Sequence, residues 1–222
     1  MGLDDTLVAV FESPYVYPIK GDISREDCVL MAEYAEDKET IEFGMGGSTI
    51  ILDKFTGKGR FTSIETDKGW FDATSKNVKR FRSISKFKHG EPNLILCEAA
   101  ASKPQKLLDI SDKLPKSAGF VFVDCIVEMR LIAMQMGWDR LESDGVLMTH
   151  DARRNGDANI VLGFVNQNLS TIKEIKFCPH RSNVFVIVKR RGDCPVVKHN
   201  WNATQKHNNR PPWGDNEETG DV

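Results

Sequence analysis

Two short apolar runs, a glycine-rich turn and an acid follow one another early in the chain, and they restrict the fold more than any other segment does. The sequence predicts a buried strand from Thr40 to Phe43, a turn from Gly44 to Gly47 where side chains would obstruct a ligand, and a helix from Ser48 to Phe55. A second strand is predicted from Phe61 to Ile64, with Glu65 at its carboxyl end. This order of strand, helix and strand is typical of an open α/β sheet.

The glycine turn and Glu65 are expected to face one crevice, because ligands of open α/β sheets bind beyond the carboxyl ends of the strands. A carboxylate there can accept hydrogen bonds from both hydroxyls of a ribose. Gly44 and Gly46 fit the first two places of the dinucleotide fingerprint Gly-x-Gly-x-x-Gly, but Thr49 stands in the third, and no P-loop sequence follows. Glu42, two residues before the first glycine, suits a ligand with a cationic end better than one with phosphates.

Strands and helices alternate along most of the remaining chain. We predict helices at 23–36, 68–81 and 127–141, and strands at 93–97, 119–125 and 146–150, the last after an Asp144-Gly145 turn. Two alternating runs, 171–178 and 183–189, predict an antiparallel hairpin. The expected fold is therefore α/β, with a doubly wound, mostly parallel, Rossmann-like sheet and a C-terminal antiparallel hairpin.

Composition excludes several classes of protein. A chain of 222 residues, 40% of them apolar, forms one domain by default, and a net charge of −2 does not demand a nucleic-acid or membrane partner. A basic stretch at 76–88 is interpreted as a solvated helix face, so we expect no nucleic-acid partner. No membrane span or signal peptide is indicated, and the five cysteines lack a Cys-x-x-Cys pair. We therefore expect a cytoplasmic protein with reduced thiols.

The motif Ile41-Glu42-Phe43-Gly44-Met45-Gly46-Gly47-Ser48-Thr49, together with Ile64-Glu65-Thr66-Asp67, resembles class I S-adenosylmethionine-dependent methyltransferases, most closely small O-methyltransferases of the catechol and cephalosporin-biosynthesis type. The likeness covers roughly residues 23 to 190. It implies a methyltransferase domain at 23–191. The aromatic residues of the N-terminal segment, 1–22, suggest a cover of the active site, and the polar composition after Arg191 predicts a flexible C-terminal tail, 192–222.

The resemblance also implies which residues bind S-adenosylmethionine. The residues around its methionine and ribose would be Glu42, Gly44, Gly46, Gly47, Ser48 and Thr49. Glu65 would bind the ribose hydroxyls, and Thr66 and Asp67 would lie at the adenine edge. Glu98 and Ala99, after the third strand, would flank the adenine amine, which needs an acceptor when it is buried.

Candidates for catalysis lie at the carboxyl ends of the fourth and fifth strands. His150 is the preferred base, because an imidazole titrates near neutrality, and Asp151 or Asp124 could orient it. The resemblance supplies a competing mechanism, in which Asp124 and Asp151 hold a magnesium ion. His150 replaces a second acid of that metal site, and no lysine stands a few residues after Asp124. We therefore predict catalysis without a metal.

The predicted function is S-adenosylmethionine-dependent methylation of an oxygen, or less readily a nitrogen, of a small molecule or sugar. Two alternatives stay open. One is an NAD(P)-dependent oxidoreductase on a similar sheet, which Thr49 and the terminal hairpin disfavour. The other is a non-catalytic nucleoside-binding module.

Overall fold

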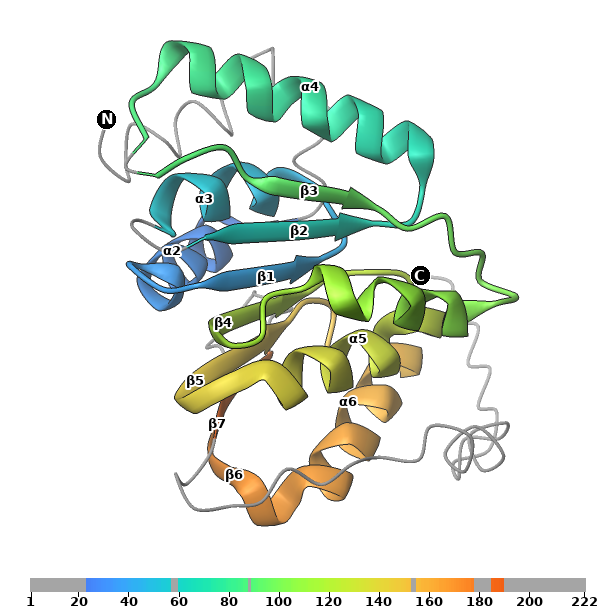
Figure 1. The fold of residues 1–222 in the computed structure, drawn as a ribbon. Helices are drawn as coiled ribbons and strands as arrows, with labels where there is room; N and C mark the ends of the chain where they lie inside the picture. Colours follow the sequence, from blue (N-terminus) through green and yellow to red (C-terminus); the bar gives the residue numbers. More distant parts are fainter. Residues whose placement is uncertain (1–22, 57–59, 88, 153–154, 178–184, 190–222) are drawn as a thin grey trace, which may run out of the picture.

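The computed structural model describes residues 23–56, 60–87, 89–152, 155–177 and 185–189. Its strands are β1 Thr40–Phe43, β2 Phe61–Glu65, β3 Asn93–Leu96, β4 Ala118–Val123, β5 Leu141–Thr149, β6 Ile172–Phe177 and β7 Phe185–Lys189. They form one seven-stranded sheet in the order β3-β2-β1-β4-β5-β7-β6 (Figure 1). Neighbours among β1 to β5 are parallel, whereas β7 is antiparallel to both β5 and β6.

Helices cover both faces of the sheet and enclose two apolar cores. They are α2 Arg25–Ala35, α3 Gly47–Phe55, α4 Lys68–Ile84, α5 Val127–Arg140 and α6 Asn155–Asn168, with two 3-10 helices, η1 Pro104–Lys113 and η2 Leu169–Thr171. Helices α2, α3 and α4 share one core, and η1, α5 and α6 share the other. Successive strand residues alternate between them, so Phe120 and Phe122 enter the first core and Val121 and Val123 the second. Burial on both faces explains why β4 is a continuous apolar run.

The predicted fold class is confirmed, including the doubly wound sheet and the antiparallel hairpin. Three elements, η1, α6 and η2, were absent from the prediction. Helix α6 contains four asparagines and two glycines, which are weak helix formers, and it is held by packing such as the edge-to-face contact of Trp138 and Phe164 at 5.5 Å. The turn predicted at Asp144 and Gly145 instead lies inside β5, where Asp144 has a φ of +61° and the pairing with β4 shifts register.

The chain after β1, β3, β4 and β5 continues the hydrogen bonding of the sheet for one residue. The N–H groups of Gly44 and Cys97 donate to carbonyls of β2 at 2.8 Å, that of Asp124 to a carbonyl of β1 at 2.8 Å, and that of His150 to a carbonyl of β4 at 3.0 Å. The glycine turn and the acids that follow β4 and β5 therefore lie along one edge of the sheet, as predicted.

Lys189 ties β7 to the end of α5. It is fully buried, and its Nζ donates to the carbonyls of Trp138, at 2.7 Å, and Leu141. The same Nζ lies 5.2 Å from the centre of the Trp138 ring. A cation stabilises the carbonyl end of a helix, so this contact fixes the hairpin against the helix layer.

Three cysteines of the described part, Cys28, Cys97 and Cys125, are buried free thiols, as predicted, while Cys178 and Cys194 lie outside it. Burial raises the pKa of all three thiols, that of Cys125 to about 12, so none is a reactive thiolate at neutral pH. No helix within the described ranges is both long and apolar enough to cross a membrane. The predicted segments 1–22 and 192–222 lie outside these ranges.

Candidate active site

The glycine turn after β1 is shaped by its packing against the chain after β4. Gly44 has a φ of +95°, a conformation that glycine adopts without strain. A Cβ at this position would lie 2.6 Å from the carbonyl carbon of Asp124 and 2.9 Å from the nitrogen of Cys125. The first glycine is therefore required by contacts within the protein itself.

The backbone N–H groups of the turn form hydrogen bonds inside the protein. The N–H of Gly44 donates to a carbonyl of β2 at 2.8 Å, that of Met45 to Glu65 Oε2 at 2.9 Å, and that of Gly46 to Thr49 Oγ1 at 2.8 Å. A turn that binds pyrophosphate directs such N–H groups at its ligand. Thr49 stands at the third place of the dinucleotide fingerprint. Its hydroxyl thus accepts the Gly46 N–H, which a phosphate would need as a donor.

Glu42, in β1, is completely buried beside the turn. Its Oε1 accepts a hydrogen bond from Ser48 Oγ at 2.5 Å, and its Oε2 accepts from Thr49 Oγ1 at 2.8 Å and Ser63 Oγ at 2.5 Å. Burial outweighs these hydroxyls and raises the pKa of Glu42 to about 8. In this site Glu42 therefore joins β1, β2 and α3, and it is largely uncharged at neutral pH.

Glu65, at the end of β2, holds the glycine turn and the start of α4 together. Its Oε1 accepts from the N–H groups of Thr66 at 2.6 Å and Asp67 at 2.9 Å, with the Thr66 hydroxyl at 3.4 Å, and its Oε2 accepts from the N–H of Met45. A carboxylate has about four acceptor positions. Among the described contacts only one is made to Oε2, so this oxygen keeps a position for a ligand hydroxyl.

The remaining predicted cofactor residues lie on the same edge. Gly47, Ser48 and Thr49 form the first turn of α3, while Thr66 and Asp67 precede α4, whose first turn Asp67 caps by accepting from the N–H of Trp70 at 2.7 Å. Beyond β3, Glu98 is exposed and Ala99 is buried. The structure therefore distributes the predicted cofactor residues over the ends of β1, β2 and β3.

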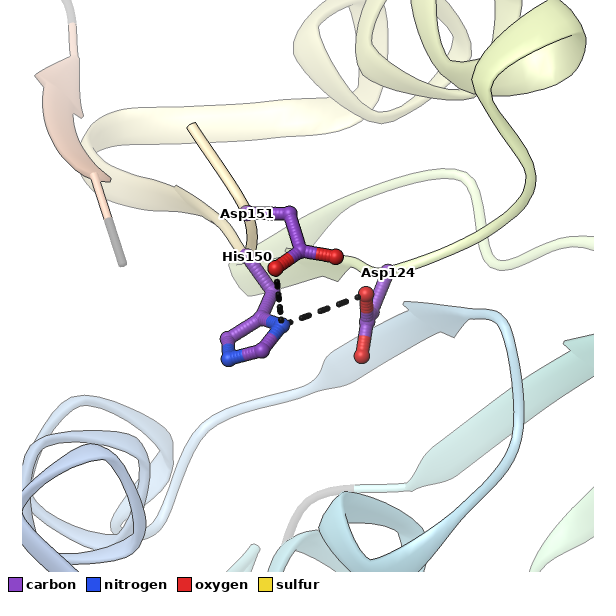
Figure 2. A group of neighbouring side chains, drawn as sticks. All are labelled: Asp124, His150 and Asp151. Carbon is purple, nitrogen blue, oxygen red and sulfur yellow. Dashed lines mark ion pairs between the residues drawn. The ribbon is translucent and has the colours of Figure 1, made fainter. Parts of the chain in front are cut away.

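The three predicted catalytic residues lie together at the ends of β4 and β5. Figure 2 shows the side chains of Asp124, His150 and Asp151 pointing toward one another. Nδ1 of His150 is 3.5 Å from Asp124 Oδ1 and 3.6 Å from Asp151 Oδ1. Asp151 has a φ of +57°, in the left-handed region that residues other than glycine rarely adopt and that is enriched at functional sites.

Asp27 of α2 adds a fourth ionisable group, which was not predicted. Its Oδ2 lies 3.7 Å from His150 Nε2 and also accepts from the N–H of Ser24 at 3.0 Å. Burial alone would lower the pKa of His150, but the carboxylates of Asp124, Asp27 and Asp151 outweigh it and raise this pKa to about 10. His150 is therefore a cation at neutral pH. The sequence signal at Ser24 and Asp27 indicated only a helix cap.

Arg130 of α5 is a second residue that the sequence did not indicate. Its buried guanidinium donates to the carbonyl of Cys125 from Nε at 3.3 Å and Nη2 at 2.9 Å, and to the carbonyl of His150 from Nη1. It also pairs with Asp124 at 3.6 Å and with Asp157 of α6 at 3.3 Å. Arg130 thus fixes the segments after β4 and β5 to one another. Its signal in the sequence was a single charge in a methionine-rich helix.

The donor set of the cluster also fits a divalent cation. Asp124, His150 and Asp151 each offer one ligand atom, and these atoms all lie within 4.8 Å of one another. Carboxylate oxygens suit magnesium, and imidazole suits several transition metals. In the described site, however, the His150 cation already supplies positive charge among these carboxylates. Two cations, His150 and Arg130, thus face the four carboxylates of Asp27, Asp124, Asp151 and Asp157.

A comparison with models of protein families finds no match, and neither does a comparison with curated proteins. Solved structures do match. The O-methyltransferase TomG of Streptomyces achromogenes, solved with S-adenosylmethionine, has a TM-score of 0.58 and 15% identity over 86% of this chain and 89% of its own. The S-adenosylhomocysteine-bound methyltransferase PaMTH1 of Podospora anserina has a TM-score of 0.58 and 16% identity, over 85% of this chain and 88% of its own. An O-methyltransferase of Bacillus cereus in complex with S-adenosylhomocysteine has a TM-score of 0.57 and 12% identity, over 85% of this chain and 90% of its own.

This is the class I methyltransferase fold. In it, the antiparallel strand β7 lies between β5 and β6, which is the feature expected to distinguish these methyltransferases from dinucleotide-binding domains. At 12% to 16% identity the similarity establishes the fold, and the chemistry of the site follows from the residues of this chain.

Proposed function

We propose that the protein is an enzyme that transfers a methyl group from S-adenosylmethionine to an oxygen of a small molecule or sugar. The class I methyltransferase fold supports this proposal, because three neighbours with that fold were solved with this cofactor or its demethylated product. When bound, S-adenosylmethionine supplies a methyl group that its sulfonium makes electrophilic. The main task of the protein is then to align the acceptor with that group.

The observation that carries the proposal is the open acceptor position on Glu65 Oε2 beside a turn whose N–H groups are used internally. A ribose hydroxyl can donate to that oxygen, whereas a pyrophosphate would find the N–H groups of Gly44, Met45 and Gly46 already bonded. We infer that the methionine and ribose lie against residues 44–49, that Thr66 and Asp67 lie at the adenine edge, and that Glu98 and Ala99 flank the adenine amine. Glu42 supports this pocket from within the protein.

We infer that the acceptor binds over the ends of β4 and β5. His150 takes the proton from the acceptor hydroxyl, and Asp124 and Asp151 orient its imidazole. The side chain of Asp124 is 24% exposed, which makes it the member of the cluster most accessible to an acceptor. Because the pKa of His150 is about 10, the fraction of imidazole able to accept a proton grows as the pH rises from neutrality.

We propose that this step needs no metal, because the imidazole of His150 stands where a second acid ligand would be and Arg130 pairs with Asp124. If a divalent cation were bound, Asp124, His150 and Asp151 would hold it, and it would supply a Lewis acid for the acceptor oxygen. Activity in the presence of a chelator separates these two mechanisms.

Calorimetric titration with S-adenosylmethionine, S-adenosylhomocysteine and NAD tests the proposed cofactor. The two adenosyl sulfur compounds are expected to bind and NAD is not. A preference for NAD would instead indicate an oxidoreductase. Binding of the adenosyl compounds without methylated product in a broad acceptor screen would indicate a non-catalytic nucleoside-binding module.

The acceptor can be identified by incubating the protein and a labelled methyl donor with cell extract, followed by mass spectrometry. We expect the label in a small molecule or sugar, and label in RNA or DNA would contradict this expectation.

We further propose a cytoplasmic enzyme whose methyltransferase domain spans 23–191, with 1–22 covering the active site and 192–222 as a tail. The contact of Asp27 with His150 supports the proposed cover, because it shows that α2 begins next to the cluster.

A further inference from the structure

Trp70, in the first turn of α4, is a large aromatic side chain that is 38% exposed beside the glycine turn. Its indole Nε1–H donates to the carbonyl of Met45, and its backbone N–H donates to Asp67 Oδ1 at 2.7 Å. The first bond holds the indole against the turn, and the second fixes the backbone from which the indole extends.

The bonds of Trp70 complete a closed ring of four residues, here called the Glu65 ring: Glu65, Met45, Trp70 and Asp67. Glu65 Oε2 accepts from the N–H of Met45 at 2.9 Å, and the carbonyl of Met45 accepts from the Trp70 indole. Asp67 accepts from the backbone of Trp70, and its own N–H donates to Glu65 Oε1 at 2.9 Å. The peptide groups on both sides of Met45 are thus fixed, one by the acid and the other by the indole.

We propose that Trp70 is a positioning residue for the adenosine part of the cofactor, acting through Met45 on Glu65. This inference rests on the proposed function, in which Glu65 binds the ribose. The Met45 N–H occupies one acceptor position of Glu65 Oε2. This bond fixes the carboxylate, so the second acceptor position of the same oxygen points in a defined direction. A ribose hydroxyl then meets an acceptor that is already oriented, so little conformational freedom is lost on binding.

The indole N–H is the part of Trp70 that this role requires. Tryptophan is a donor only, and phenylalanine keeps an aromatic ring of similar character without the donor. Because the ring is only partly buried, Trp70→Phe removes little packing. The variant should therefore fold like the wild type while the carbonyl of Met45 loses its partner.

The test is a double-mutant cycle on the full chain, with the affinity for S-adenosylhomocysteine measured by calorimetry. Trp70→Phe is expected to weaken binding about fivefold, the effect of one hydrogen bond. If Trp70 acts through Glu65, the variant that carries both Trp70→Phe and Glu65→Gln binds S-adenosylhomocysteine no more weakly than Glu65→Gln alone. Ile84→Ala, at the far end of α4 where the side chain is 67% exposed, is the control and keeps wild-type affinity.

Tryptophan fluorescence provides a second readout that loss of stability alone does not produce. S-adenosylhomocysteine is expected to change the fluorescence of the wild type and of Ile84→Ala, and this change should be absent in Trp70→Phe. The inference would be overturned if Trp70→Phe bound S-adenosylhomocysteine with wild-type affinity. It would also be overturned if the effects of the two substitutions on affinity were additive in the cycle, or if Trp70→Phe kept the fluorescence change of the wild type. A wild type that does not bind S-adenosylhomocysteine would instead overturn the proposed function and this inference with it.

Discussion

The two halves of the candidate site hold their polar groups in different ways. At the ends of β1 and β2, Glu42 and Glu65 accept hydrogen bonds of 2.5 to 2.9 Å from hydroxyl and N–H groups. At the ends of β4 and β5, Arg130 donates to two backbone carbonyls, and the charged side chains form ion pairs of 3.3 to 3.7 Å among Asp27, Asp124, Arg130, His150, Asp151 and Asp157. Hydrogen bonds depend steeply on geometry, whereas charges attract over a range of distances.

This difference indicates that the first half is preorganised for one ligand, while the second can adjust to an acceptor. The halves meet where Gly44 packs against the backbone of Asp124 and Cys125. A change confined to one half should therefore affect cofactor affinity or turnover, and a change at the junction should affect both.

The largest effect is expected at this junction. Gly44→Ala would press a Cβ into the Asp124 backbone at a φ of +95°, so we expect the free energy of unfolding to fall by about 4 kcal/mol and binding of S-adenosylhomocysteine to be lost. Urea denaturation and calorimetry measure the two effects. The control is Gly163→Ala in α6, where a Cβ would meet open space and helix propensity favours alanine. Equal stability of the two variants would contradict the tight junction.

The next largest effect is expected from Arg130→Met, which keeps the length of the side chain and removes its charge. It leaves the carboxylates of Asp124 and Asp157 without their buried partner, so the free energy of unfolding should fall by about 3 kcal/mol. Turnover should fall further than affinity for S-adenosylhomocysteine, because Arg130 belongs to the half with the ion pairs. Arg80→Met, on the exposed face of α4, serves as the control and should match the wild type in both assays.

His150→Ala should lower turnover about 100-fold and leave cofactor affinity within about twofold of the wild type. A group with a pKa of about 10 is protonated at pH 7, and its base form increases about tenfold per pH unit below that pKa. The kcat/KM of the wild type should therefore rise between pH 7 and 9, and that of the variant should not. A flat wild-type profile would show that His150 does not accept the proton.

Glu42→Gln tests the half with the hydrogen bonds. Burial raises the pKa of Glu42 from 4.5 to about 8, so the folded state binds a proton that the unfolded state has released. The resulting stability is complete below pH 4.5 and is lost as the pH rises toward 8. The free energy of unfolding of the wild type should fall, relative to the variant, by about 3 kcal/mol between pH 5 and 7.5, measured by urea denaturation. Parallel pH profiles would show that Glu42 is charged in the folded protein.

The smallest effect is expected from metal removal. Because the proposed step uses the His150 imidazole as base and Arg130 pairs with Asp124, excess chelator should leave methyl transfer unchanged in a labelled-methyl assay. Magnesium added back after chelation provides the control. Loss of activity with recovery on addition of magnesium would assign Asp124, His150 and Asp151 to a metal site.

Most of the sheet was predictable, because a parallel strand buried on both faces can leave a continuous apolar run such as the one from Ala118 to Val123. The grouping of Asp124, His150 and Asp151 was predictable too, since each follows the carboxyl end of a parallel strand. Asp27, Arg130 and Trp70 were not predicted as site residues. They come from helices, and their roles depend on how each helix packs against a distant segment, which one sequence does not encode as a local pattern.

The burial of Lys189 has a practical consequence for protein engineering. Its ammonium group is the internal donor for the carbonyls of Trp138 and Leu141, so a truncated version for crystallisation must retain the chain through this residue. A reporter or affinity tag joined upstream of it would deprive the end of α5 of that donor. Any junction is therefore best placed after Lys189.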